Sequence, residues 1–379
     1  MFSTHAHDPD LHFSEKLRYL PWGFVFVVML LSLFGVAMLY SAGGASWKPW
    51  AATQLYRVIP GLLLMLAIGL VDIRFWYRWS FLLYASALLL LVAVVAIGHT
   101  GMGAKRWIRM GIFVLQPSAY MKVVLAMVLA KYFHQLTYEQ IGNPLRLFTP
   151  AGLVLVPAAL ILIEPNLGMA TLLVLFSAAV FFLAGVRWWI FGLLGVGVPF
   201  AAQQAWKHLH DYQKQRLLTF INPEQDPLGS GYNIIQSKIA LGSGGLFGKG
   251  FGMGTQSQLN FLPEKHTDFI FVVLAEEMGL MGAVLLLVLF FILIAYGYVI
   301  SLNCRHQFGR LLGLGLTTSF FLYVLTNVAM VTGLIPVVGI PLPLVSYGGS
   351  VMLAFYIACG LLLSIAIHKD ARLDGSAPQ

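Results

Sequence analysis

The chain has 379 residues, of which 59% are hydrophobic and only 10% are charged, with a formal net charge of +8. A typical soluble domain carries about 25% charged residues. This composition excludes a water-soluble globular protein and indicates a polytopic membrane protein whose apolar surface faces lipid. We expect membrane lipids around it and no nucleic acid partner. The two cysteines, Cys304 and Cys359, indicate neither a disulfide framework nor a cysteine metal site.

Apolar runs of about 20 residues follow a polar N-terminal tail at residues 1–19, and each can cross a hydrocarbon core of about 30 Å. The first run is longer than a signal-peptide core and lacks a small-residue cleavage site, so it is predicted to remain as a span. The predicted spans are 20–40, 51–70, 79–97, 117–133, 147–163, 167–184, 188–206, 268–300, 311–332 and 344–367. The fold class is therefore all-α, with about ten transmembrane helices in one domain at 20–368. A long extracytoplasmic loop at 206–267 separates helices seven and eight, and residues 369–379 form a C-terminal tail.

The distribution of Lys and Arg predicts which way the chain crosses the membrane. An even number of spans places both termini on one side, and the positive-inside rule makes that side the cytoplasm. Three cations nevertheless fall in the short outer segment 101–113, against this rule, and mark a candidate anion site. The inner cations are Arg74, Arg78, Arg146, Arg187, Arg305 and Arg310, with Lys16, Arg18, Lys369 and Arg372 in the tails. The outer ones are Lys105, Arg106 and Arg109, with Lys207, Lys214, Arg216, Lys238, Lys249 and Lys265 in the long loop.

Asp268 is the strongest candidate for chemistry, in the segment EKHTDFIFVVLAEE. It is predicted at the outer mouth of a span, with Thr267 as the helix cap. Partial burial there would raise the pKa of its carboxyl and suit a general base. The alternative is structural, because an aspartate in a first helical turn is stabilised by the helix dipole.

Three further acids interrupt apolar runs. Glu276 and Glu277 lie roughly 12 Å below Asp268 on the same predicted helix, at 1.5 Å per residue. Helical spacing of 100° per residue brings Glu276 closer to the direction of Asp268, so it is the better candidate for the same cavity. A buried structural hydrogen-bonded pair is the alternative. Glu164 precedes Pro165 at a helix end, where freed backbone groups face a cavity, or else it is a solvated acid in an outer turn.

Lys122 lies one to two turns inside the fourth span and requires an anionic partner, unless it snorkels to the interface. Together with Lys105 and Arg106 it would form a basic group suited to a pyrophosphate. The glycine-rich run at 241–254 departs from the nucleotide-binding pattern, so we predict a mobile loop able to approach a substrate, or a flexible spacer. The preceding segment predicts a short interfacial helix, with Ile234, Ile235, Ile239 and Leu241 toward lipid and Gln236 and Lys238 toward water.

Several long motifs resemble the SEDS family of shape, elongation, division and sporulation proteins, and in particular its elongation branch. The resemblance covers residues 20–368. It is carried by GAKRWI (103–108), QPS (116–118) with Lys122, EPNLG (164–168), GSGYNIIQSKIALGSGGLFGKG (229–250), TQSQLNFLPEKHTDFIFVVLAEEMGL (255–280) and PVVGIPLPLVSYGGS (336–350).

The resemblance implies peptidoglycan glycosyltransfer, in which lipid II is polymerised into β-1,4 glycan at the outer face of the bacterial cytoplasmic membrane. The family's essential aspartate falls on Asp268, which would deprotonate the acceptor 4-hydroxyl while undecaprenyl pyrophosphate leaves with inversion. Mg or Mn ions could share the phosphate charge, although no metal ligand set can be read. Pyrophosphate binding is expected from Lys105, Arg106, Lys122, Lys238 and Lys265, with Glu164, Glu276 and Ser346 in support.

The resemblance also implies partners and contains one departure. A class B penicillin-binding protein, acting as transpeptidase, and other elongation-machinery proteins are expected to associate with the chain. The family pattern QPSE has a glutamate where this chain has Ala119, so Lys122 is either freer for phosphate or compensated by Glu164. Two alternatives remain: a lipid II flippase, and a non-catalytic scaffold for a penicillin-binding protein.

Overall fold

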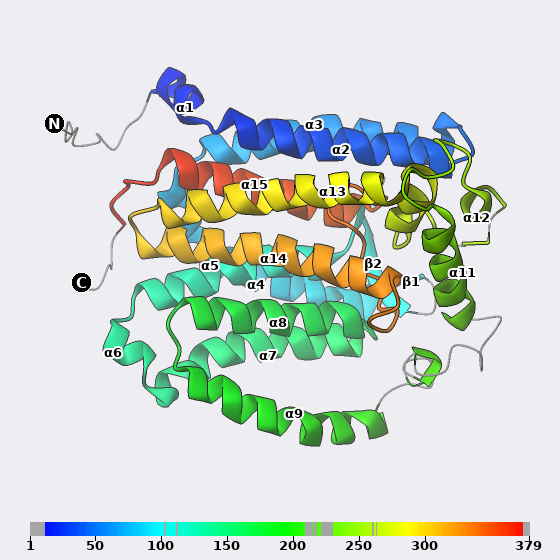
Figure 1. The fold of residues 1–379 in the computed structure, drawn as a ribbon. Coiled ribbons are helices and arrows are strands. Elements are labelled where there is room, and N and C mark those ends of the chain that lie inside the picture. Colours follow the sequence, from blue (N-terminus) through cyan, green and yellow to red (C-terminus); the bar gives the residue numbers. More distant parts are fainter. Residues whose placement is uncertain are drawn as a thin grey trace.

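The computed structural model describes residues 12–101, 104–110, 113–208, 214, 218–220, 230–259, 261–262 and 264–373. The helices form one bundle whose two ends differ (Figure 1). One end, called the sheet end below, carries the strands together with α11 and α12, whereas α1 and the last turn of α15 lie at the opposite end. The helices of the first half are α1 (Phe13–Tyr19), α2 (Trp22–Ala42), α3 (Ala52–Leu70), α4 (Ile73–Ile97), α5 (Pro117–His134), α6 (Tyr138–Ile141), α7 (Phe148–Ile163) and α8 (Leu167–Leu183). Those of the second half are α9 (Trp188–His208), α11 (Ser230–Ser243), α12 (Thr255–Gln258), α13 (Ile270–Leu302), α14 (Gln307–Val331) and α15 (Gly349–Ile367).

Seven helices in the described ranges are long and apolar enough to cross a membrane. They are α2, α3 with the preceding π-helical turn Trp47–Ala51, α4, α7 with the preceding 3₁₀ turn Pro144–Leu147, α13, α14 and α15. Helices α5, α8 and α9 occupy the three remaining predicted spans. The all-helical membrane fold is thus confirmed.

Some predicted boundaries were wrong. α4 begins at Ile73, because the Asp72 carboxylate caps it by accepting the Arg74 N–H at 2.8 Å. α15 begins only at Gly349, so residues 344–348 belong to the irregular segment before it. Two elements were not predicted. α1 occupies part of the expected polar tail, and a small antiparallel sheet is formed by β1 (His99–Gly101), β2 (Ala104–Met110) and β3 (Phe113–Leu115).

Close helix contacts at the centre of the bundle depend on small residues. A side chain at Gly61 of α3 would meet the ring of Tyr356 of α15, and one at Gly360 would meet Ile68. Such contacts are typical of membrane helices, because lipid is as apolar as a side chain and tight packing supplies the attraction. The Tyr356 hydroxyl donates to Ser32 of α2 at 2.8 Å, so three helices are fixed together.

Candidate functional site

Asp268 lies in a turn at residues 264–269, directly before α13 at the sheet end. The predicted cap at Thr267 is wrong. The N-cap residue is Phe269, and the Thr267 hydroxyl donates instead to the Glu264 carboxylate at 2.9 Å. Asp268 is partly exposed, whereas Phe269 and Ile270 after it are buried. The turn therefore holds the aspartate at the edge of the bundle with a buried helix start behind it.

The main chain of Asp268 is fixed by α14. The side-chain amide of Asn327 donates to the Asp268 carbonyl at 2.9 Å and to the Ile340 carbonyl at 2.7 Å. Oδ2 of Asp268 lies only 3.4 Å from where a Cβ at Gly339 would stand, and φ at Gly339 is +70°. The irregular segment 333–348 thus forms a wall beside the carboxylate, at a position where glycine is required for close approach.

Ser346 also holds this turn through hydrogen bonds. Its hydroxyl donates to the Thr267 carbonyl at 2.6 Å and accepts the Leu342 N–H at 2.8 Å. Next in sequence, the Tyr347 N–H donates to the His266 carbonyl at 2.9 Å. Ser346 therefore holds the main chain of the turn at Thr267, the residue directly before Asp268.

An aromatic group flanks the turn. The His266 ring stacks on Trp50 at 3.9 Å between centroids, and Trp50 makes an edge contact with Tyr347. Burial lowers the pKa of His266, the Glu264 charge opposes this and Lys265 reinforces it. The Arg57 guanidinium lies over the Tyr347 ring at 4.7 Å. Arg57 therefore joins the surroundings of Asp268 through aromatic contacts.

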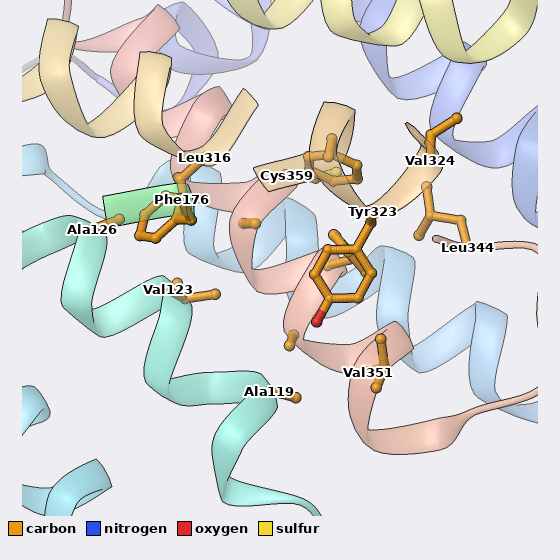
Figure 2. Close-up of a cluster of buried hydrophobic side chains, with 14 of the residues drawn as sticks. Ala119, Val123, Ala126, Phe176, Leu316, Tyr323, Val324, Leu344, Val351 and Cys359 are labelled. Atoms are coloured by element: carbon orange, nitrogen blue, oxygen red, sulfur yellow. The ribbon is translucent and has the colours of Figure 1, made fainter. Parts of the chain in front are cut away.

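Lys122 is buried in the bundle, so the snorkelling alternative is wrong. Its ammonium group donates to the Tyr323 hydroxyl and lies 3.3 Å from the Met169 sulfur. In the described part of the chain, no carboxylate lies within ion-pair distance of it. Lys122 and Ala119 line a cavity of about 20 Å³, room for roughly one water molecule. Figure 2 shows Tyr323 reaching from α14 toward Ala119 of α5 and Val351 of α15.

Glu164 lies in the turn between α7 and α8. It is only 2% exposed, so the alternative of a solvated acid is wrong. Neither carboxylate oxygen has a hydrogen-bond partner among the described residues. Burial raises the pKa of the Glu164 carboxyl to about 8, and the positive charge of Arg106 opposes this rise. Glu164 forms no ion pair with Lys122, so it does not replace the carboxylate missing at Ala119.

The predicted basic group is only partly assembled. Arg106 donates to the Pro165 carbonyl at 2.6 Å, and Lys122 contacts Met169 four residues later, so both approach the start of α8. Lys265 donates instead to the Ser257 carbonyl at 2.6 Å. Lys238 is exposed on α11 and lies over Gly333. The main chain of Lys105 pairs with Thr100 in the sheet, but its side chain lies outside the described residues.

Glu276 lies away from Asp268, in a separate polar cluster. It is fully buried and accepts hydrogen bonds from Lys249, Thr255 and the main chain of residues 256 and 257. These contacts favour the structural alternative for Glu276. Ile234 of the predicted interfacial helix is buried, because α11 packs on α13 and α14, whereas Ile239 of the same predicted face is exposed.

The described ranges contain no group of side chains that could form a metal centre by themselves. No three His, Cys, Asp or Glu side chains group there at metal-binding distances. Among the described residues, no such group is available to hold a divalent cation without further ligands.

Comparison with known proteins identifies the family. The FtsW/RodA/SpoVE family, described as cell cycle proteins, matches residues 21–371. The chain belongs to this family. It is 41% identical to the peptidoglycan glycosyltransferase MrdB of Escherichia coli K12 over 346 residues, covering 90% of this chain and 92% of that protein. It is 37% identical to stage V sporulation protein E of Bacillus subtilis, covering 91% and 96%.

Solved structures agree with this assignment. A chain of a peptidoglycan synthase complex that coordinates polymerization and crosslinking superposes with a TM-score of 0.80 at 31% identity, covering 93% of this chain and 99% of that chain. The rod shape determining protein RodA of Thermus thermophilus superposes with a TM-score of 0.70 at 28% identity, covering 93% and 98%. The predicted resemblance to the SEDS family, which includes RodA, is thereby confirmed.

Within this family fold, sequence reasoning missed three residues near the site. Asn327 holds Asp268, Tyr323 contacts Lys122, and Arg57 lies over Tyr347. A charged or amide side chain inside an apolar span is costly and signals a specific partner. That signal was present at Arg57 and Asn327. Tyr323 carried no such mark, because tyrosine is common in membrane helices.

Proposed function

We propose that this chain polymerises lipid II into β-1,4 glycan strands at the outer face of the cytoplasmic membrane during cell elongation. The protein is a peptidoglycan glycosyltransferase of the SEDS family. The observation that carries the specific mechanism is the placement of Asp268. Asn327 binds its carbonyl group and Ser346 binds that of the preceding Thr267, while Asp268 itself stays partly exposed at the end of the bundle.

The proposed reaction is a single displacement at the anomeric carbon of the donor. The Asp268 carboxylate accepts the proton of the acceptor 4-hydroxyl as that oxygen attacks the donor sugar. A new glycosidic C–O bond forms, and the bond between the anomeric carbon and the pyrophosphate oxygen breaks with inversion. Undecaprenyl pyrophosphate leaves with the electron pair of that bond. A fixed turn around the base favours this chemistry, because small misplacements of a catalytic group are costly.

Cationic side chains would stabilise the departing pyrophosphate. We assign the principal role to Arg106, which donates to the Pro165 carbonyl before α8, and to Lys122, which contacts Met169 in the first turn of α8. Lys105, Lys238 and Lys265 are proposed as secondary contacts with the head group. Any Mg or Mn ion would then be carried by the phosphate oxygens of the substrate.

We further propose that the sheet end faces the periplasm and that both termini are cytoplasmic in the inner membrane. Similarity to a chain of a polymerizing and crosslinking complex supports a crosslinking enzyme as partner. A class B penicillin-binding protein is the proposed partner, and other elongation-machinery proteins are proposed to join it.

The test uses the full chain with its partner in proteoliposomes and fluorescent lipid II. Asp268→Asn should abolish glycan chains while leaving the protein folded and bound to its partner. Asp370→Asn is the matched control, because Asp370 pairs with Arg305 at the opposite end of the chain's bundle. Polymerisation by Asp268→Asn at the wild-type rate would overturn the mechanism. If the wild-type protein moved lipid II across the bilayer without forming any polymer, it would be a flippase. If the wild-type protein did neither, it would be a scaffold.

A further inference from the structure

The glycine-rich segment, defined here as residues 244–254, is bonded to α13 through its main chain. α13 is interrupted at Gly279, whose φ of 65° and ψ of −165° are non-helical. Two N–H groups released by this break donate to the segment, and two N–H groups of the segment donate back. The four bonds are Leu280 N to Gly245 O at 2.9 Å, Met281 N to Leu246 O at 3.1 Å, Lys249 N to Glu276 O at 3.1 Å and Gly250 N to Glu277 O at 2.9 Å. The segment is thus fixed to a spanning helix and is not a free spacer.

The single charged side chain of the segment, that of Lys249, is 27% exposed and pairs with a buried acid of α13. Lys249 pairs with the buried Glu276 at 2.8 Å and also donates to Thr255 at 2.7 Å. The adjacent Glu277, also buried, accepts the Ser41 hydroxyl at 2.6 Å and main-chain N–H groups of Gly252 and Gly254. In water, a lysine of a loop would normally face solvent. Here the Lys249 ammonium is neutralised by a carboxylate on the protein side of the segment.

The apolar side chains of the same segment point outward. Leu246 is 61% exposed, Phe247 79%, Phe251 51% and Met253 68%. On α13, Leu280 and Met281 are exposed beside them. A surface with large apolar side chains outside and its one charge paired with a buried carboxylate is the arrangement expected in lipid.

Contacts with α2 indicate how deep the segment 244–254 lies in the membrane. This helix has 21 residues, a length of about 31 Å at 1.5 Å per residue, which matches the hydrocarbon core. Its last turn at the sheet end contacts the segment, since Ser41 binds Glu277 and the Tyr40 ring stacks on Phe251 at 6.5 Å. Trp47 adjoins Tyr40 at 5.3 Å. Tyrosine and tryptophan gather where a membrane meets water. The segment therefore lies level with one membrane boundary.

We propose that residues 244–254 are inserted into the membrane at this boundary. Leu246, Phe247, Phe251 and Met253 enter the acyl chains of the leaflet at the sheet end. Glu276 and Glu277 hold the main chain of the segment from behind. The lipid hydrocarbon is the occupant of this face, because the surface continues the lipid-facing side of α13 and its only charge is paired with Glu276.

Site-directed spin labelling in proteoliposomes tests the proposal. Both native cysteines are buried and are replaced by alanine, after which Phe247→Cys and Met253→Cys are labelled separately. Phe291→Cys, 70% exposed in the middle of α13, provides the lipid reference. Glu139→Cys, exposed in α6, provides the water reference. Relaxation by dissolved oxygen reports lipid, and relaxation by a water-soluble nickel chelate reports water.

We expect labels at 247 and 253 to match the lipid reference, with high oxygen and low nickel accessibility. Nickel accessibility equal to that at residue 139 would overturn the proposal, because the segment would then lie in water. Low accessibility to both reagents would also overturn it, because another protein surface would then cover the segment. Both labelled sites carry exposed side chains, so neither variant is expected to unfold the protein.

Discussion

The side-chain amide of Asn327 donates to the main-chain carbonyl of Asp268 at 2.9 Å. The same nitrogen donates to the Ile340 carbonyl at 2.7 Å, and Asn327 is fully buried on α14. One side chain therefore fixes the aspartate turn to both α14 and the irregular segment before α15. Because the residue is buried, water cannot replace these hydrogen bonds if the amide is lost.

Asn327→Ala is therefore expected to lower polymerisation at least tenfold and to destabilise the protein by about 2 kcal/mol, since two buried carbonyl groups lose their donor. Asn327→Asp should be worse, because a carboxylate would face both carbonyl oxygens. Lipid II polymerisation and thermal unfolding in detergent measure the two effects. Thr332→Val is the control, because that hydroxyl binds only the main chain of its own helix end. Full activity of Asn327→Ala would show that the turn holds its shape without the amide.

The buried carboxyl group of Glu164 should make the stability of the folded protein depend on pH. Burial raises the pKa of its carboxyl from 4.5 to about 8 in the folded protein, so the folded state retains a proton that the unfolded state has lost between these values. This contribution is complete below pH about 4.5 and is lost as pH rises toward about 8. Glu164→Gln stays neutral, so its melting temperature should exceed that of the wild type by an amount that grows over this range. The exposed Glu139→Gln is the control, and parallel curves for Glu164→Gln and wild type would contradict the prediction.

We expect substitutions at Ala119 and Lys122 to have coupled effects on the stability of the protein. The two residues line the same small cavity one helical turn apart, and the buried ammonium group lacks a carboxylate partner among the described residues. Ala119→Glu should be better tolerated than Ala119→Gln, because only the glutamate supplies a counter-charge. In the Lys122→Met background this order should reverse. A double-mutant cycle on thermal stability should give a coupling of about 1–3 kcal/mol, and additive effects would exclude the pair.

The Glu276 cluster predicts unequal effects of its two charged members. Glu276→Ala leaves several donors without an acceptor inside the protein and should cost about 3 kcal/mol. Lys249→Ala should cost about 1 kcal/mol, because the remaining donors still satisfy the carboxylate. Thermal unfolding of both variants measures this order. Equal losses would mean that the ion pair itself, and not the set of donors, holds the cluster together.

Alanine substitutions at two glycines of the segment 244–254 distinguish backbone strain from steric collision. Both Gly248 (φ +79°) and Gly252 (φ +76°) have left-handed backbone conformations, so alanine costs about 1 kcal/mol at either. At Gly248 the new methyl group would also collide with the Glu277 carbonyl, whereas nothing lies within 4 Å at Gly252. Gly248→Ala should therefore lower the melting temperature clearly more than Gly252→Ala. Equal shifts would show that the segment can move away from α13.

Much of the fold could be predicted from the sequence, and so could the position of the residue that we propose as the catalytic base. Apolar runs long enough to cross a membrane marked the spans, because hydrocarbon imposes a minimum length on any helix that crosses it. Asp268, Lys122 and Glu164 stood out because charged groups near or within such runs are costly without a specific environment. Helix starts were less predictable. The starts of α4 and α15 depend on Asp72 and on the path of residues 344–348, and not on apolar length.

The sequence by itself determined that this protein crosses a membrane many times and carries one acid where the eighth span begins. Only the tertiary structure decided which groups meet: Asn327 with Asp268, Tyr323 with Lys122, and Lys249 with Glu276. The physical reason lies in the surroundings of the spans. Lipid and protein interior are equally apolar, so hydrophobic periodicity does not mark which face of a span is buried. Polar partners on different helices are therefore identified only when the helices are packed together.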